Sequence, residues 1–192
     1  DEDFLQAAVE GKCKVDLDGY VSDAPFVTKR KVTAHYLSET PWSEGGVMVA
    51  PSGDIFYNSN RDYMNDQKSD DDIYRNGERL AFNTDGWAGN PHYCVARDEL
   101  YFDERDERIW VLRNAAASNF SGTPEVVQFP IDRIKSGVRA FQPFLTPDCN
   151  RIFYTAPGPS GPAIYHADRV LDGSWGEPTL FIASNIGVGE FT

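Results

Sequence analysis

The sequence has little cysteine, little positive charge and no long apolar segment. Its three cysteines, Cys13, Cys94 and Cys149, lack C-x-x-C spacing, which argues against structural zinc and thioredoxin-type chemistry. They leave two alternatives, one disulfide with a free thiol or three thiols. No apolar run approaches ~18 residues, so we expect no membrane insertion. Lys+Arg number 18 against 30 Asp+Glu, and this net charge of −12 argues against nucleic-acid binding.

Motifs for common catalytic chemistry are missing too. The chain has no G-x-S-x-G elbow, no H-E-x-x-H and no phosphate-binding glycine loop. Its three histidines, His35, His92 and His166, fall in separate predicted strands. The acidic residues leave open a carboxylate pair of the kind used by glycoside hydrolases. If a pair must be named, it is Glu190 with Asp148, but we lean towards a protein without catalytic activity.

Short β-type segments dominate the sequence and recur as a set. One apolar tripeptide appears three times, each time after a polar turn: Ile55-Phe56-Tyr57, Leu100-Tyr101-Phe102 and Ile152-Phe153-Tyr154. An apolar strand precedes each turn, at Gly46 to Ala50, His92 to Ala96 and Gln142 to Thr146. Two further short strands follow each tripeptide, and the last of them is expected at Glu78 to Asn83, Pro124 to Phe129 and Pro178 to Ala183. Four short strands per unit at a nearly constant period predict an all-β fold, a β-propeller with four-stranded blades.

The units give the domain boundaries. One propeller domain is expected over 1–192, with blades near 44–86, 88–137 and 139–184 and a composite blade made from 186–192 and 12–40. A ring of four blades closed in this way leaves no open sheet edge. The alternative is about half of a six- to eight-bladed propeller, completed by a partner chain or by a second copy of this chain.

The third unit carries a family resemblance. Ala140 to Asp148, then Arg151 to Tyr154, Ala163 to Ala167 and Gly173 to Pro178 resemble the WD40-like repeat of the TolB type, also called PD40. The resemblance is weaker over 45–137, where Ser52-Gly53-Asp54 replaces the usual Pro-Asp-Gly turn. It implies a central channel and a periplasmic or extracellular binding scaffold, and it supplies no catalytic residues. The sequon Asn119-Phe120-Ser121 is consistent with an extracellular location.

Ligand candidates follow from the geometry of a propeller, where innermost strands run beside the axis. Equivalent positions there form a ring, which the repeat phase assigns to Gly46, His92, Gln142 and Glu190. Such a ring can hold a cation or a polar group, or it can be filled by water. Trp42, Trp87 and Trp175 lie in connecting loops. They can stack on a glycan or a small molecule, or they can pack between blades.

An acidic loop is the one candidate for a metal site. Asp70, Asp71 and Asp72, with Asp62 and Asp66 nearby, offer the oxygen ligands that Ca²⁺ or Mg²⁺ prefers. Their spacing does not match an EF-hand, so a solvated loop is the competing interpretation. No other cofactor is indicated. The sequence therefore predicts a scaffold for a small-molecule, glycan or protein ligand, with a propeller-type glycoside hydrolase and an interaction subunit of a hetero-oligomer as alternatives.

Overall fold

The computed structural model describes residues 43–62, 71–84, 86–104, 108–129, 139–158 and 161–183. These residues all belong to the compact unit Trp42–Thr192. The predicted composite blade lies outside the described residues. The described part of the chain contains no helix long and apolar enough to cross a membrane.

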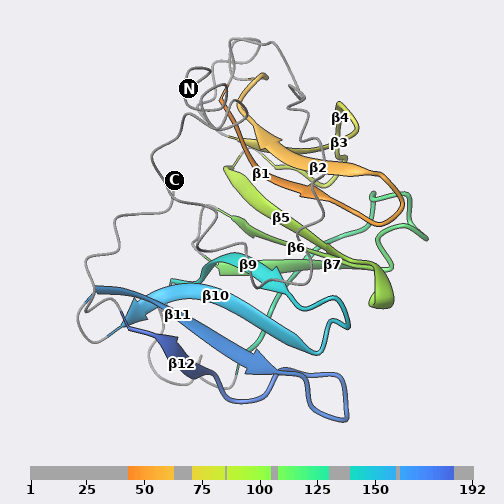
Figure 1. Ribbon diagram of the computed structural model, residues 1–192. Coiled ribbons are helices and arrows are strands. Elements are labelled where there is room, and N and C mark those ends of the chain that lie inside the picture. The colour runs from red at the N-terminus through yellow and green to blue at the C-terminus, as the bar shows by residue number, and fades with distance from the viewer. Residues whose placement is uncertain are drawn as a thin grey trace, which may run out of the picture. The chain divides into compact units, whose positions relative to one another are not determined.

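Three four-stranded antiparallel sheets make up the described structure (Figure 1). The first sheet contains β1 (Glu44–Val49), β2 (Ile55–Ser59), β3 (Asp72–Arg75) and β4 (Glu78–Arg79). The second contains β5 (Ala88–Cys94), β6 (Glu99–Glu104), β7 (Arg108–Arg113) and β8 (Glu125–Val126), with the 3-10 turn η1 (Val95–Arg97) between β5 and β6. The third contains β9 (Phe141–Leu145), β10 (Arg151–Gly158), β11 (Gly161–Asp168) and β12 (Thr179–Ile182). The all-β prediction is confirmed, and each sheet pairs its strands in chain order.

The fourth strand of the first sheet is shorter than the apolar pattern suggested. β4 ends at Arg79, whereas the sequence predicted a strand to Asn83. The Asn83 side chain pairs with the backbone of β3 in place of a strand residue. Its Oδ1 accepts from the Ile73 N–H at 2.9 Å, and its Nδ2 donates to the Ile73 carbonyl at 2.8 Å. An amide that satisfies both backbone groups of a strand residue ends the pairing without leaving buried groups unsatisfied.

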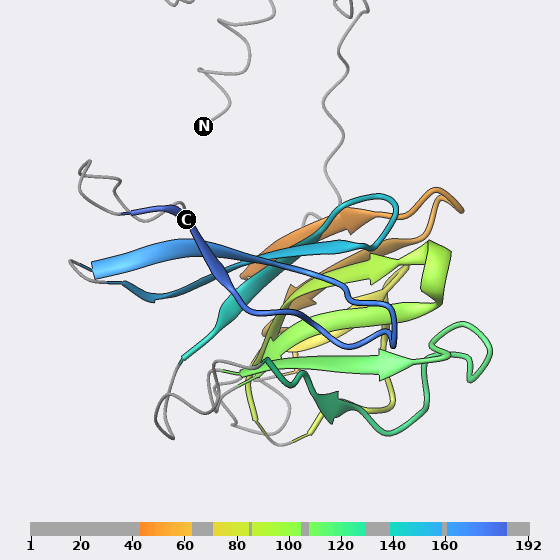
Figure 2. The ribbon, with the colours of Figure 1, turned by 90° about the horizontal axis from the view of Figure 1, so that it is seen from below.

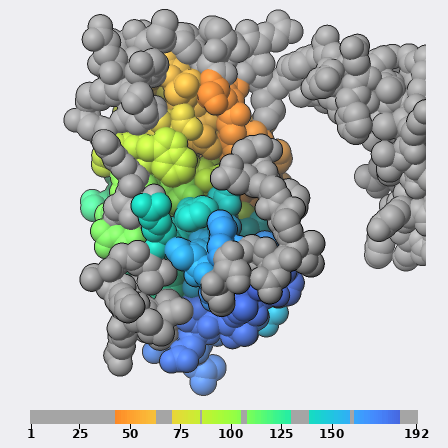
Figure 3. All heavy atoms as spheres, turned by 90° about the vertical axis from the view of Figure 1, so that its left-hand side faces the viewer, coloured from red at the N-terminus to blue at the C-terminus, as the bar shows by residue number. Residues whose placement is uncertain are grey.

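The sheets follow one another in space as they do in sequence. β5 contacts both β1 and β2, and β9 contacts both β5 and β6 (Figure 1). The turns that join the first and second strands of each sheet lie at the same end, both in this view and from below (Figure 2). The space-filling view shows the same succession of sheets from orange to blue (Figure 3).

Each pair of neighbouring sheets encloses its own apolar core. The core between the first and second sheets includes Phe56, Ile73, Tyr93, Leu100 and Phe120. The core between the second and third sheets includes Tyr101, Val111, Leu145, Ile152 and Trp175. Successive residues of the repeated tripeptide point to opposite faces of their strand, so each second strand contributes to packing on both sides of its sheet.

Candidate functional site

The first strand of each sheet carries a bulge at an equivalent position. Gly46, Asn90 and Gln142 have φ angles of 55°, 49° and 57°, the left-handed region that side chains rarely adopt. The antiparallel register shifts at each of these points. An extra residue with left-handed φ turns a backbone N–H away from its own sheet. In β5 and β9 that N–H points to the preceding sheet.

A residue of the preceding sheet receives each of these N–H groups. The Asn58 Oδ1 on β2 accepts from the backbone N–H of Asn90 at 3.4 Å. The Asp103 Oδ2 on β6 accepts from the backbone N–H of Gln142 at 2.7 Å. Asn58 and Asp103 each follow the repeated tripeptide directly, so the same contact joins the first sheet to the second and the second to the third.

Side-chain hydrogen bonds extend these two contacts into one polar belt. We define the polar belt by its members, which are Asp71, Asn58, Asn90, Asp103, Gln142 and Thr155. At one end the Asn58 Nδ2 donates to the Asp71 carboxylate at 2.7 Å. In the middle the Asn90 Nδ2 donates to the Asp103 Oδ2 at 3.0 Å. At the other end the Thr155 hydroxyl donates to the Gln142 Oε1 at 3.1 Å.

Asp103 is the electrostatic centre of the belt. Asp103 is fully buried, and this burial raises the pKa of its carboxyl to about 6. The Gln142 N–H and the Asn90 amide act in the opposite direction, because they donate to the ionised form, but burial outweighs them. No basic side chain is hydrogen-bonded to this carboxylate in the described residues. The belt thus contains an acid whose charge changes close to neutral pH.

The register corrects one member of the ring predicted from the repeat phase. Val49 pairs with Ile55, Tyr93 with Leu100 and Leu145 with Ile152. These pairs place Asn90, and not His92, at the position of Gly46 and Gln142. The prediction took Ser52, Asp98 and Asp148 as equivalent turn residues. Ser52 and Asp148 each lie three residues after the paired residue of the first strand, whereas Asp98 lies five residues after Tyr93, so the second unit was out of phase by two. Glu190 lies outside the described residues.

His92 lies on β5 with its ring against the third sheet. Its imidazole meets the Phe144 ring edge-on, with centroids 4.9 Å apart, and it is hydrogen-bonded to the Leu145 backbone. Burial lowers the pKa of His92 to about 4, so the ring is neutral at physiological pH. A neutral histidine at an interface between two sheets is better suited to packing than to ion binding.

The three tryptophans have different surroundings. Trp42 lies outside the described residues. Trp87 packs over Gly89, where an added Cβ would lie 2.6 Å from the indole. Trp175 is buried between the second and third sheets, with Tyr101 on one side and the Arg169 guanidinium 4.2 Å from its ring centroid. The Trp175 indole is therefore occupied by packing contacts within the protein.

The described aspartates of the acidic loop make separate structural contacts and do not converge on one site. Asp70 lies outside the described residues, Asp71 belongs to the polar belt, and Asp72 forms a bidentate ion pair with Arg79 at 2.6 Å and 2.9 Å. Across the described ranges no group of three or more His, Cys, Asp or Glu side chains could hold a metal ion. Asp148 sits in an exposed turn, where hydrogen bonds from Thr146 and Asn150 lower the pKa of its carboxyl. These bonds indicate a turn-forming role for Asp148.

A second cluster that the sequence did not predict joins the second and third sheets. Arg169 is nearly fully buried and donates to the Glu99 carboxylate at 2.7 Å and to the Tyr101 hydroxyl at 2.8 Å. Beside it, Cys94 and Cys149 form a disulfide. The structure therefore selects one disulfide from the two alternatives open in the sequence. Among the described residues, this interface has the only covalent link between sheets.

The belt residues did have a signal in the sequence. Asn58, Asp103 and Thr155 are the polar residues that immediately follow the three copies of the apolar tripeptide. A polar residue at the same position of every repeat indicates that this position has an equivalent role in each unit. The partner, a backbone N–H of the next sheet, has no signature in side-chain pattern.

No family model matches the sequence, and no curated protein is significantly similar to it.

Proposed function

We propose that this chain is a β-propeller of the WD40-like, TolB-type class and that it acts as a non-enzymatic binding scaffold. Its ligand site lies at the exposed end of the polar belt, on the axial side of the inner strands. The ligand class that fits is a glycan or another polar small molecule.

The repeated contact between sheets is the observation that carries this proposal. The residue after each tripeptide accepts the N–H of the next inner strand, once from Asn90 and once from Gln142. The same contact joins the first sheet to the second and the second sheet to the third, so a similar rotation relates the sheets of each pair. Repetition of such a rotation generates sheets arranged around an axis, which is the architecture of a propeller.

The distribution of polar groups supports binding over catalysis. The buried polar side chains of the described residues are hydrogen-bonded within or between the sheets, namely Asn58, Ser59, Asp72, Glu99 and Asp103. Their hydrogen bonds hold the scaffold together. By contrast, Gln142 is exposed and Thr155 is partly exposed, and an amide beside a hydroxyl suits the hydroxyl groups of a sugar.

The disulfide supports a proposal about the compartment in which the protein works. Disulfides persist in the periplasm and outside the cell and are rare in a reducing cytosol. A covalent link between two sheets of the scaffold fits an extracellular or periplasmic binding protein. We therefore propose that the protein works in an oxidising compartment.

Binding of defined oligosaccharides to the full chain tests the proposal. The probes are maltohexaose, cellohexaose and chitohexaose, measured by calorimetry and by amide chemical shifts. We expect at least one probe to bind, and we expect Thr155→Val or Gln142→Asn to weaken it at least tenfold. Asn is chosen because it tolerates the left-handed backbone at position 142. Gln128→Asn, at an exposed glutamine outside the belt, is the matched control and leaves affinity unchanged.

Three results overturn the proposal. The first is that none of the probes binds the folded chain. The second is that binding occurs but is insensitive to both belt variants. The third is release of 4-nitrophenol from aryl glycosides by the chain, which would favour the glycoside hydrolase instead.

A second candidate is an interaction subunit in which a partner chain extends the propeller. The favouring observation lies on β1, where Val47 and Val49 are 50% and 62% exposed. Tyr93 and Leu145, which occupy the position of Val49 in the other sheets, are buried against the preceding sheet. Native mass measurement decides: a single species at the 21.5 kDa chain mass excludes an obligate complex.

A further inference from the structure

The segment between β7 and β8 forms an ordered turn that carries an Asn-x-Ser triplet. Asn119-Phe120-Ser121 is the one triplet of this kind in the 192 residues. In the folded protein Asn119 and Ser121 are exposed, whereas Phe120 between them is only 2% exposed. The turn thus presents to solvent the two residues that define the triplet and buries the residue whose identity the triplet leaves open.

Phe120 anchors this turn to the core between the first and second sheets. Its ring packs on Phe56 of β2 and on Tyr93 of β5, with centroids 5.3 Å and 5.4 Å away. Asn119 has a φ angle of 50°, a left-handed conformation that asparagine adopts more readily than most residues. The exposed asparagine therefore belongs to a turn whose position is fixed by the buried ring beside it.

The Asp98 carboxylate holds the first half of the same turn. It accepts from the backbone N–H groups of Ala116 and Ala117 at 2.6 Å and 3.2 Å. The Asn119 side-chain amide, in contrast, has no hydrogen bond to any other described residue. A substituent on the Asn119 Nδ2 would therefore break no contact of the described fold.

The turn is separated from the centre of the polar belt by the length of β6. Asp98 directly precedes β6, whereas Asp103 is the next-to-last residue of that strand. A group attached at Asn119 therefore does not occupy the belt.

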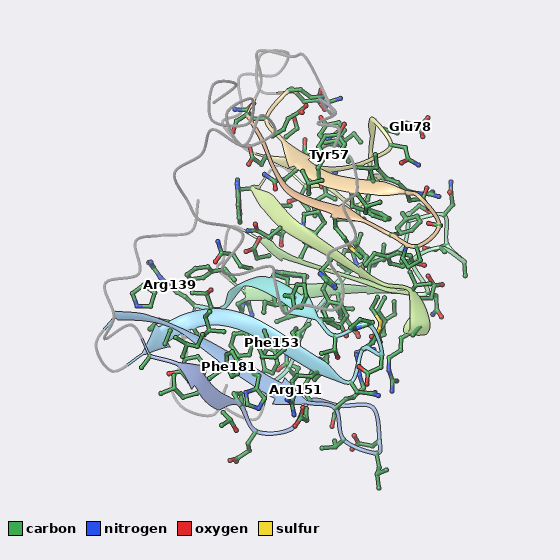
Figure 4. All side chains as sticks on the ribbon, viewed as in Figure 1. Tyr57, Glu78, Arg139, Arg151, Phe153 and Phe181 are labelled. Carbon is green, nitrogen blue, oxygen red and sulfur yellow. A yellow bond between two sulfur atoms is a disulfide. The ribbon has the colours of Figure 1, made fainter. Side chains whose placement is uncertain are left out.

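The disulfide lies at the same end of the second sheet as this turn. Cys94 pairs with Glu99, the residue after Asp98, and its bond to Cys149 is the yellow sulfur–sulfur bond in Figure 4. Disulfides form in oxidising compartments, which include the lumen of the endoplasmic reticulum. Asn-x-Ser triplets of secreted proteins receive their glycans in that same lumen. The disulfide is thus a second observation, independent of the triplet, that is consistent with passage through this compartment.

We propose that Asn119 carries an N-linked glycan in the secreted protein. The donor is an oligosaccharide linked to a lipid pyrophosphate. The Asn119 Nδ2 forms a bond to the anomeric carbon, the bond from that carbon to the pyrophosphate oxygen breaks, the lipid pyrophosphate leaves, and the amide gives up one proton. Transfer takes place on the nascent chain, and the fold then keeps the glycan in solvent because Asn119 is exposed. The inference shares only the oxidising compartment with the proposed function and does not depend on the ligand site.

The modification can be measured on protein purified from its natural source. Peptide N-glycosidase F is applied in heavy-oxygen water, where it converts a glycosylated asparagine into an isotope-labelled aspartate. We expect the label at position 119, together with a loss of about 2 kDa from the intact mass.

Variants of the full chain secreted from cultured human cells separate recognition of the triplet from effects on folding. Asn119→Gln and Ser121→Ala should each abolish the mass loss, whereas Ser121→Thr should retain it because threonine also completes the triplet. Asn114→Gln is the matched control and should retain the mass loss. Asn114 is exposed in the same turn, also with a φ of 50°, but it begins no Asn-x-Ser or Asn-x-Thr triplet.

Two results overturn the inference. The first is an unlabelled Asn119 in the protein from its natural source. The second is a mass loss that persists in both Asn119→Gln and Ser121→Ala. A chain that lacks the glycan but binds an oligosaccharide probe refutes this inference alone, and a glycosylated chain that binds none of the probes refutes the proposed function alone.

Discussion

Replacement of Asp103 by Asn tests the electrostatics of the polar belt. The buried carboxyl has its pKa raised from 3.8 to about 6 in the folded protein, because burial penalises the charged form more than the Gln142 N–H and the Asn90 amide stabilise it. A raised folded pKa means that the native state binds a proton that the unfolded chain has already released. Asp103 therefore contributes stability that is complete below about pH 4 and is lost as the pH rises through 6.

The structure sets the size of this effect. A difference of about 2.2 pKa units at about 1.4 kcal/mol per unit corresponds to about 3 kcal/mol in the free energy of unfolding. The Asp103→Asn variant cannot ionise, and its side-chain oxygen can still accept from the Gln142 N–H. We expect the stability of the wild type relative to this variant to fall by about 2–3 kcal/mol between pH 4 and pH 7.

Urea unfolding followed by tryptophan fluorescence at half-unit pH steps measures this difference. Subtraction of the variant's profile removes the contributions of all other titrating groups. Asp148→Asn is the matched control, because hydrogen bonds lower the pKa of that exposed carboxyl and its contribution instead grows as the pH rises. Parallel profiles for the wild type and Asp103→Asn, within about 0.5 kcal/mol from pH 4 to 7, would refute the reasoning.

Three further predictions concern the contacts between sheets, each measured by chemical unfolding. The paired change Cys94→Ala with Cys149→Ala should lower stability by about 4 kcal/mol, since the disulfide closes a loop with a sequence separation of 55; a loss below about 1 kcal/mol would contradict the bond. Gly46→Ala should cost about 2–4 kcal/mol, because φ is 55° and the new Cβ would lie 2.8 Å from the backbone of β5; Gly77→Ala, also left-handed but in open space, is the control and should lose about 1 kcal/mol. Arg169→Met should cost about 3 kcal/mol by removing one of the two cations, Arg169 and Arg113, that pair with the buried Glu99 carboxylate, and neutralising that carboxylate as well should restore part of the loss.

The strands themselves were predictable because their signal is local. Short apolar runs and the turn residues that bound them are properties of a few neighbouring positions, so the three apolar tripeptides and their turns located β2, β6 and β10 correctly. The recurrence of these short segments likewise predicted the all-β class. The end of β4 was predicted too late because the Asn83 amide can replace a strand residue, which alternation cannot reveal.

The candidate site depended on relations between sheets. Counting along the chain assigned His92 to the position of Gly46, whereas the register assigns Asn90 to it, because Asp98 stands two residues later in its turn than Ser52 and Asp148 do in theirs. The choice of Cys94 with Cys149 and the pairing of Arg169 with Glu99 join positions that are 55 and 70 residues apart. No local pattern records such pairs.

The amino-acid sequence by itself determined that the chain forms repeated four-stranded antiparallel units with apolar faces, since short apolar runs and turn chemistry are properties of adjacent residues. Only the tertiary structure decided which backbone N–H meets Asp103, which cysteines bond and which aromatic side chains are buried. These depend on how one sheet rotates against the next, and that rotation is fixed by packing among residues far apart in the chain.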